Sequence, residues 1–215
     1  MRFIQAGVLV VAMVVLGCGR PASPPEATPD IPAEAATGES AGTADTPPAP
    51  VDESAKEVSV KVMDYDGIQM LIDSYRGQVV VVDYWSTDCP PCIKELPGLV
   101  KLDEKYPDDQ VRCITVSLDY IGLADEGPES YEPRVLGILK PLNVRCTNII
   151  ASDDSETMLR KLDLSAPPAV YVYGPDRKRV KRFDNEEAQN ENEAFTYDDV
   201  ERLVQELLGS KPAAD

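Results

Sequence analysis

The sequence predicts an α/β domain in which a β-sheet is sandwiched between helices. Strand-like and helix-like segments alternate through the first part of this domain, and a hairpin followed by a final helix closes it. The chain has 215 residues, of which 43% are hydrophobic, and this is enough for one domain with a buried core. We expect the domain to span residues 58–210.

Three strands and two helices are expected in the first half of the domain. Residues 58–62 alternate between apolar and polar side chains, as a strand does, and residues 64–75 place apolar side chains on one helical face. Residues 79–85 form a continuous apolar run, typical of a strand that is buried on both faces. A helix over 90–106 and a β-branched strand over 111–118 follow.

The second half is expected to close with a hairpin and a helix. The hairpin strands are residues 169–173 and 179–183, because Gly and Pro between them favour a turn. The last helix starts at Thr196, which forms a capping-box-like pair with Asp199, and it stops at Gly209. Between the two halves we expect a helix over 129–142, a strand over 144–150 and a helix over 155–162.

Charge and composition exclude several functions. Lys and Arg number 21 against 38 Asp and Glu, and the net charge of -17 argues against a nucleic-acid binder held by phosphate contacts. The chain has no histidine, which excludes Ser-His and Cys-His catalytic pairs and any zinc or haem site built on its own imidazoles. We therefore expect no metal or cofactor, and chemistry carried by the five cysteines and by carboxylates.

The N-terminus has the pattern of an export signal. Residues 1–17 contain one cation and then an apolar run that is too short for a comfortable membrane span. The run ends in Val15-Leu16-Gly17-Cys18, which resembles the signal of bacterial lipoproteins, where the peptide is cut before a cysteine that is then lipidated. The alternative is an ordinary secretory signal with an incidental cysteine. The resemblance implies a lipoprotein anchored to a lipid membrane through Cys18, facing the periplasm or another extracytoplasmic space.

The segments on either side of the domain differ from it in composition. Residues 18–57 are rich in Pro, Ala and Glu and contain no aromatic side chain. Such a segment cannot bury enough apolar surface to offset its chain entropy, so we expect a disordered, semi-extended tether. Residues 211–215 are expected to form a short disordered tail.

The most informative motif is Cys89-Pro90-Pro91-Cys92, at the junction of the buried strand and the following helix. Two cysteines on the first turn of a helix are close enough to form a reducible disulfide. The helix N-terminus presents a positive potential that stabilises a thiolate. Cys89 is the expected exposed, attacking sulfur, and Cys92, one turn into the helix, is the expected resolving sulfur.

The residues around the two sulfurs affect the direction of the reaction. Pro90 and Pro91 remove the amide donors of the first two helical positions, so only the Cys92 N–H remains to bond the Cys89 sulfur. Asp88 adds negative charge immediately upstream. We therefore predict a weakly stabilised Cys89 thiolate and a reducing rather than a strongly oxidising couple.

Together these features resemble the thioredoxin superfamily, and within it the TlpA/ResA-like, membrane-anchored thiol–disulfide oxidoreductases. The resemblance covers roughly residues 58–208 and implies a thioredoxin-like fold with a central mixed β-sheet. Asp83 stands where thioredoxins keep a buried aspartate that accepts a proton from the inner cysteine, and Glu95 matches a glutamate of the ResA-like active site. The alternative for Asp83 is a strand-end carboxylate. The alternatives for Glu95 are a solvated residue on the helix face or a partner of Lys94 or Lys101.

The same resemblance extends to a proline-containing loop. Pro167 aligns best with the cis-proline that faces the disulfide in this superfamily, although the adjacent Pro168 leaves open which bond is cis. Asp88 departs from the family pattern, which usually has an aromatic residue before the first cysteine. We expect the substrate-facing surface to include five residues, with Trp85 also packing under the site. They are Trp85, Asp88, Pro90, Pro91 and Ala166.

Two further cysteines, Cys113 and Cys146, each follow Val-Arg in a predicted strand. They fit two descriptions, a pair of buried thiols that act as small hydrophobes or a structural disulfide of an extracytoplasmic protein.

The sequence as a whole predicts a thiol–disulfide oxidoreductase that reduces disulfides of extracytoplasmic proteins. The resemblance implies apocytochrome c as one possible client class and a membrane thiol reductant as the source of electrons. One alternative is a Cu(I)-binding chaperone, although related chaperones add a histidine ligand that this chain lacks. Another alternative is a non-catalytic, tethered interaction module. A peroxidase is disfavoured because no Thr-x-x-Cys motif is present.

Overall fold

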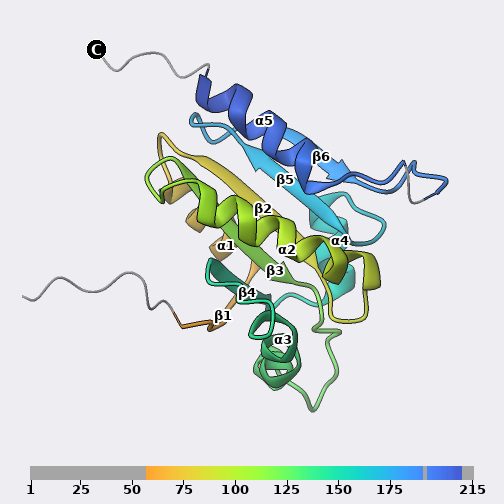
Figure 1. Cartoon of the computed structure of the whole chain (residues 1–215). Helices are drawn as coiled ribbons and strands as arrows, with labels where there is room; N and C mark the ends of the chain where they lie inside the picture. Colours follow the sequence, from red (N-terminus) through yellow and green to blue (C-terminus); the bar gives the residue numbers. More distant parts are fainter. Residues whose placement is uncertain (1–56, 191–192, 210–215) are drawn as a thin grey trace, which may run out of the picture. The chain divides into compact units, whose positions relative to one another are not determined.

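The computed structural model of the chain describes residues 57–190 and 193–209, and the expected signal, tether, Cys18 and C-terminal tail lie outside these residues, apart from residue 57. Within them, strands and helices alternate as the sequence predicts (Figure 1). In chain order the elements are β1 (Lys61–Met63), α1 (Tyr65–Ser74), β2 (Val79–Trp85), α2 (Pro90–Lys105), β3 (Val111–Ser117), the 3-10 helix η2 (Pro128–Tyr131), α3 (Glu132–Leu139), β4 (Thr147–Ala151), α4 (Ser155–Leu162), β5 (Ala169–Tyr173), β6 (Arg179–Asp184) and α5 (Tyr197–Gly209).

The strands form one mixed sheet of six strands in the order β1-β4-β3-β2-β5-β6. β1, β4, β3 and β2 are parallel, whereas β5 is antiparallel to β2 and β6 is antiparallel to β5. β2 lies inside the sheet and all seven of its residues are buried, as its continuous apolar run predicts. The predicted fold class, a mixed sheet sandwiched by helices, is confirmed.

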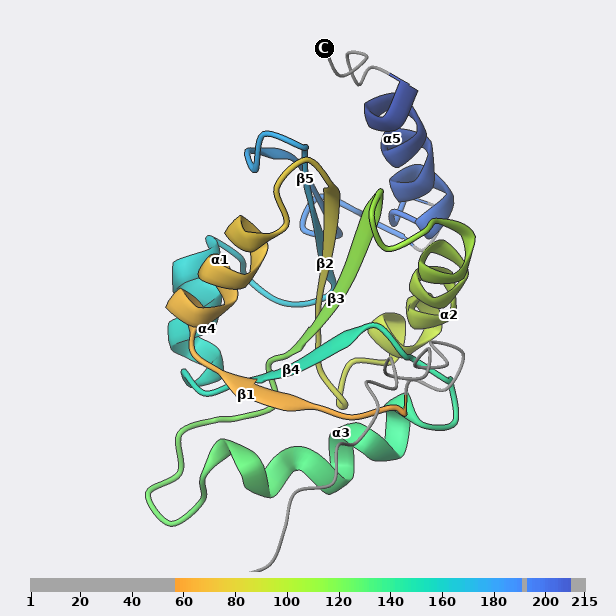
Figure 2. The ribbon, with the colours of Figure 1, turned by 90° about the vertical axis from the view of Figure 1, so that its left-hand side faces the viewer.

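Helices cover both faces of the sheet. Figure 2 shows α1 and α4 on one face and α2 and α5 on the other. The side chains of β2 alternate between the two cores, with Val81 and Trp85 beneath α2 and α5 and Val82 and Tyr84 beneath α1 and α4. Asp83 lies between Val81 and Trp85 in this alternation, so its carboxyl group points toward the α2 and α5 side.

Several element boundaries follow from local capping. Asp64 accepts a hydrogen bond from the Gly67 amide and begins α1, and Asp154 caps α4 in the same way through Thr157. The Asp199 carboxylate accepts hydrogen bonds from both the amide and the hydroxyl of Thr196, as predicted for the start of α5.

Three predicted elements differ from the observed ones. The single helix expected over 129–142 is divided into η2 and α3, because Pro133 lacks an N–H and starts a new helix in its first turn. The strand expected over 144–150 begins only at Thr147. Val144 instead lies beyond the turn that follows α3, where its amide bonds to the Leu139 carbonyl after Asn143 adopts a left-handed conformation (φ 57°). The first strand is shifted to Lys61–Met63, where it pairs with β4.

Across residues 57–190 and 193–209, no helix combines the length and the apolar character needed to cross a bilayer.

Candidate active site

A disulfide joins Cys89 and Cys92 at the start of α2, four residues after the end of β2. Cys89 is the N-cap residue of the helix, and the two Cα atoms are 5.3 Å apart. Pro90 and Pro91 occupy the first two helical positions, and the remaining amide, that of Cys92, donates to the Cys89 sulfur at 3.3 Å. This is the arrangement that the motif predicts.

The two sulfurs differ in their access to solvent. Cys89 is 8% exposed, whereas Cys92 is 1% exposed and packs in the core with Leu96 and Leu99. Pro90 and Pro91 beside them are exposed. An external thiol or disulfide therefore reaches Cys89 before Cys92, which fits the order of attack expected from the sequence.

Asp83 is a buried carboxyl group beneath α2 and α5. It is 2% exposed, and the Tyr197 hydroxyl of α5 donates to its Oδ2 at 2.6 Å. Burial raises the pKa of Asp83 from 3.8 to about 7, the hydrogen bond from Tyr197 opposes this shift, and the charge of Glu95 adds to it. Asp83 can thus both hold and release a proton close to neutral pH.

Glu95 lies on α2, one turn after Cys92, and is half-buried. Its charge raises the pKa of Asp83, so the fold does bring the two carboxyl groups into electrostatic contact. The structure thereby groups Asp83 and Glu95 on the side of the sheet that carries the disulfide. Their catalytic roles remain predictions.

The cis peptide bond joins Pro167 to Pro168, so the cis-proline is Pro168 and the assignment to Pro167 is wrong. Sequence could not separate the two, because either proline can follow a cis bond. Pro168 is buried and immediately precedes Ala169, which pairs with Tyr84 of β2. The loop therefore lies at the end of β2 that leads to Cys89.

Trp85 does not reach the protein surface. Its side chain is fully buried, at 0% exposure, and belongs to the same core cluster as Cys89 and Cys92. The hydrophobic run of β2 carries it under the site, where a large apolar ring gains most from burial. The other residues expected at the substrate-facing surface are exposed, namely Asp88, Pro90, Pro91 and Ala166.

Sequence reasoning missed the residues that hold the loop before Cys89. The buried Asp119 accepts hydrogen bonds from the Thr87 amide at 3.0 Å, from the Thr87 hydroxyl at 2.5 Å and from the Ser117 hydroxyl at 2.6 Å. The available signal was its position directly after a strand, because parallel neighbours such as β2 and β3 bring their carboxyl ends together. At the surface, Arg134 of α3 forms an ion pair with Asp88.

Tyr197 was also missed, although it lies three residues before Val200 and shares the buried face of α5 with it. Tyr197 reaches Asp83 of β2 while packing closely against α2. Gly98 of α2 permits this approach, because a Cβ at that position would collide with the Cβ of Tyr197.

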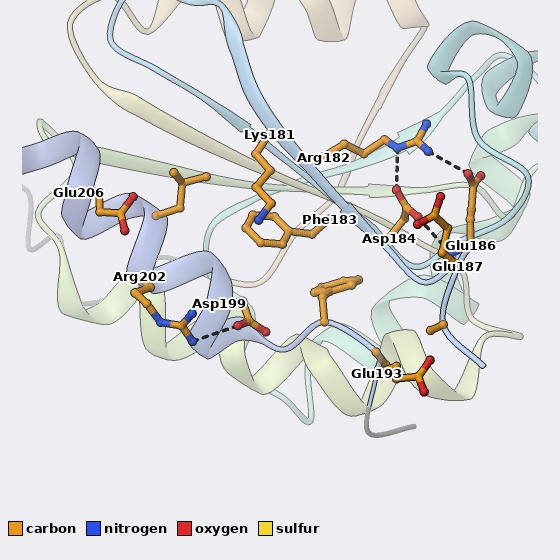
Figure 3. Close-up of a pocket in the computed structure, with 14 residues that line it drawn as sticks. Lys181, Arg182, Phe183, Asp184, Glu186, Glu187, Glu193, Asp199, Arg202 and Glu206 are labelled. Atoms are coloured by element: carbon orange, nitrogen blue, oxygen red, sulfur yellow. Dashed lines mark hydrogen bonds and ion pairs between the residues drawn. The ribbon is translucent and has the colours of Figure 1, made fainter. Parts of the chain in front are cut away.

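A pocket of about 810 Å³ lies between β6, the segment that follows it and α5 (Figure 3). Arg182 forms ion pairs there with Asp184 and Glu186. Neither Cys89 nor Cys92 lines this pocket, so it is separate from the redox site.

Comparison with known proteins places the chain in a family. The sequence profile described as the AhpC/TSA family matches residues 51–181. The chain belongs to the AhpC/TSA family. Among curated relatives, the thiol-disulfide oxidoreductase ResA of Bacillus thuringiensis subsp. konkukian (strain 97-27) is 22% identical over 134 residues, which cover 62% of this chain and 70% of the relative. The sporulation thiol-disulfide oxidoreductase A of Bacillus subtilis (strain 168) is 40% identical over 43 residues, covering 20% of this chain and 26% of the relative.

A solved structure supports the fold of this AhpC/TSA family member. The thiol-disulfide isomerase from Corynebacterium glutamicum superposes with a TM-score of 0.50 at 16% identity, covering 65% of this chain and 86% of that protein. The predicted thioredoxin-like fold is confirmed. The predicted enzyme class, a thioredoxin-like thiol–disulfide oxidoreductase, is confirmed as well.

Proposed function

We propose that the protein reduces disulfide bonds of extracytoplasmic proteins with the dithiol of Cys89 and Cys92. The observation that carries this proposal is the Cys89–Cys92 disulfide at the N-terminus of α2, with the more accessible sulfur at the N-cap. Transfer of two electrons from the dithiol to a client disulfide produces this bonded form.

The reaction proceeds in two exchanges. The Cys89 thiolate attacks one sulfur of the client disulfide, a bond forms between Cys89 and the client, and the other client sulfur leaves as a thiolate. The Cys92 thiolate then attacks the Cys89 sulfur, which closes the Cys89–Cys92 disulfide and releases the second client thiolate. The client gains two electrons, and the two released thiolates take up two protons.

Asp83 is the proposed acceptor of the Cys92 proton. Cys92 is almost fully buried, so it needs an internal base before it can act as a thiolate. The Asp83 carboxyl group lies beneath the helix that carries Cys92, and its pKa of about 7 is suited to proton exchange near neutral pH. Tyr197 acts as a positioning residue that holds the Asp83 carboxyl group.

The geometry at the helix start supports reduction as the direction of the reaction. Only the Cys92 amide bonds to the Cys89 sulfur, because Pro90 and Pro91 contribute no N–H. The ion pair with Arg134 offsets the negative charge of Asp88. This charge therefore destabilises the Cys89 thiolate less than the sequence alone suggests. The missing amide donors are the main reason for a weakly stabilised Cys89 thiolate.

The location and the partners rest on the N-terminal sequence and on the family resemblance. Residues 1–17 and Cys18 form the proposed lipoprotein signal and anchor, and residues 18–57 form the proposed tether of the domain at 58–210. In this arrangement the clients are disulfide-containing extracytoplasmic proteins, with apocytochrome c as one candidate. A membrane thiol reductant re-reduces the Cys89–Cys92 disulfide.

Insulin-disulfide reduction by the full chain tests the proposal. The wild type is expected to be active, Cys89→Ser is expected to be inactive, and Cys146→Ser is the matched cysteine control outside the site. Inactive wild-type protein that binds Cu(I) tightly would instead favour a copper chaperone. In residues 57–190 and 193–209 no cluster of three or more Cys, Asp or Glu side chains is arranged to hold a metal ion.

A further inference from the structure

Among the residues that the structure describes, two cysteines lie outside the redox site, Cys113 and Cys146, and neither forms a disulfide. The structural disulfide considered for them is therefore absent. Cys113 belongs to β3 and is 3% exposed, whereas Cys146 immediately precedes β4 and is half-buried. The question is whether these thiols are only small hydrophobes or can react as a pair.

Strand register brings the two cysteines together. β3 and β4 are parallel, and Ile114 is opposite Thr147. Cys113 directly precedes Ile114 on β3, and Cys146 directly precedes Thr147 in the bend before β4, so the two cysteines lie side by side at the start of this pairing. Neighbouring strands are about 4.8 Å apart, which is within the range of about 4.4–6.8 Å that disulfides span between Cα atoms.

The side chains of the two cysteines also share a face of the sheet. The next pair on that face is Thr115 and Asn148, and the Thr115 hydroxyl donates to Asn148 Oδ1 at 2.9 Å. Cys113 lies two residues before Thr115 on β3, and Cys146 lies two residues before Asn148 in the bend before β4. Both cysteines pack in the same core cluster, on the side of the sheet covered by α2 and α5. The Cys146 thiol also donates to Asn148 Oδ1, at a sulfur–oxygen distance of 3.7 Å.

Both cysteines line one surface pocket of about 430 Å³. This volume is in the range of sites for small molecules, roughly 300–1,000 Å³. Cations and anions line it together, among them Lys61, Arg145 and Asp103. A small polar molecule can therefore enter where a folded protein cannot.

We infer that Cys113 and Cys146 form a second redox-active cysteine pair, which low-molecular-weight disulfides entering this pocket oxidise. The pair is separate from Cys89 and Cys92 and does not depend on the function proposed for them. Its two thiols are held by β3 and by the bend before β4 rather than by one helical turn.

The proposed oxidation has two steps. The Cys146 thiolate attacks the small disulfide, which gives a mixed disulfide at Cys146 and releases one small thiol. The Cys113 thiolate then attacks the Cys146 sulfur, which forms the Cys113–Cys146 disulfide and releases the second small thiol. Two electrons pass to the small disulfide, and the two cysteine protons end on the released thiols.

The order of the two steps follows from burial. Cys146 is the more accessible thiol and meets the small molecule first. Burial raises the pKa of the Cys113 thiol well above its usual value, and the neighbouring Cys146 raises it further. Cys113 is therefore a poor first nucleophile, and it acts on a sulfur that is already in place beside it.

Oxidised glutathione is a suitable probe, used on the full chain with Cys18→Ser, Cys89→Ser and Cys92→Ser so that only the pair remains. Acid quenching and peptide mass spectrometry should find a Cys113–Cys146 cross-link. With Cys113→Ser added, a glutathione adduct should accumulate at Cys146. With Cys146→Ser added instead, adduct formation at Cys113 should be at least about tenfold slower, since access and thiolate fraction control reactivity.

The inference is overturned if both thiols stay free in the folded chain at high oxidised glutathione. A Cys146 adduct that persists while Cys113 is present would also overturn it, because the pair would not close. Circular dichroism checks the fold of each variant, and Cys113→Ala replaces Cys113→Ser if serine unfolds the chain. Peptide mapping of the oxidised wild-type chain requires no substitution. Since Cys89 and Cys92 are absent from the test variants, the result is distinct from that of insulin reduction.

Discussion

Asp83 carries a buried carboxyl group whose pKa lies near neutral pH. Its pKa of about 7 comes chiefly from desolvation in the layer beneath α2 and α5. A carboxyl group of this kind is useful beside a buried thiol, but it costs stability once it ionises. The balance between these two effects can be measured.

Asp83→Asn should stabilise the fold at alkaline pH. Because the pKa of Asp83 is raised from 3.8 to about 7 on folding, the wild type loses stability as the pH rises through this window. Asn has no charge to bury, so the free energy of unfolding of Asp83→Asn should rise relative to that of the wild type between pH 3.5 and pH 8. The change in this difference should approach roughly 4 kcal/mol. Urea unfolding of both chains at the two pH values measures this difference. A difference that does not change with pH would mean that Asp83 is not held protonated by the fold.

Tyr197→Phe should move the pH dependence of the resolving step. The hydrogen bond from Tyr197 lowers the pKa of Asp83, so its loss should shift the midpoint of client release from Cys89 upward from about pH 7. Stopped-flow measurement of client release between pH 5 and pH 9 records the midpoint, and Asp83→Asn should lack this transition. A purely structural role of Tyr197 would slow the reaction and leave the midpoint where it is.

At the scale of a single element, the first turn of α2 determines how the Cys89 thiolate is stabilised. Pro90 and Pro91 begin the helix without amide donors, and the Cys92 amide alone contacts the Cys89 sulfur. This helix start therefore supplies fewer hydrogen bonds to the sulfur than a helix start with free amides.

Restoring the backbone N–H donors at positions 90 and 91 should make the Cys89 thiol more acidic. Replacing Pro90 and Pro91 by Ala returns two N–H groups to the N-terminus of α2, which lowers the Cys89 pKa and makes the couple more oxidising. The rate of alkylation by iodoacetamide against pH gives the pKa in each chain, and Pro107→Ala, just beyond the other end of the helix, is the matched control. A wild-type Cys89 pKa below about 5 would contradict the account.

Element boundaries were predictable where local chemistry sets them. The apolar run of β2, the prolines that begin α2 and the capping of α1 and α4 all act within a few residues, and these elements are observed close to where they were expected. The single helix expected over 129–142 is divided in the structure, because Pro133 lacks an N–H and lies in the first turn of α3. The bond before Pro168 and the burial of Trp85 depend on packing against other elements, which periodicity does not show.

At the scale of the whole molecule, the fold assembles the site from distant segments. Asp83 and Tyr197 are 114 positions apart in the sequence, and Thr87 and Asp119 are 32 apart. Cys89 and Cys92 could be predicted from the C-x-x-C motif, and Asp83 from the resemblance to the thioredoxin superfamily. Tyr197 on α5 could not be predicted as a partner of Asp83, because only the packing of α5 over β2 brings the two residues together. Asp119 had a signal in its position directly after a strand, but its contact with Thr87 depends on the pairing of β2 with β3.

The same sheet holds two cysteine pairs in different settings. Cys89 and Cys92 follow β2, where the helix start and the buried Asp83 support exchange with protein disulfides. Cys113 lies on β3 and Cys146 just before β4, and both line a small pocket. The central claim concerns the first pair, in which Cys89 attacks and Cys92 resolves.

Trapping the mixed disulfide tests that claim most directly. Two variants of the full chain are each mixed with insulin, one with Cys92→Ser and one with Cys89→Ser. Both also carry Cys18→Ser and Cys146→Ser, which remove the other accessible thiols. The account predicts that Cys92→Ser accumulates a covalent complex with insulin through Cys89, which dithiothreitol releases, and that Cys89→Ser forms almost none. A complex formed equally well by Cys89→Ser, or no complex with Cys92→Ser, would contradict it.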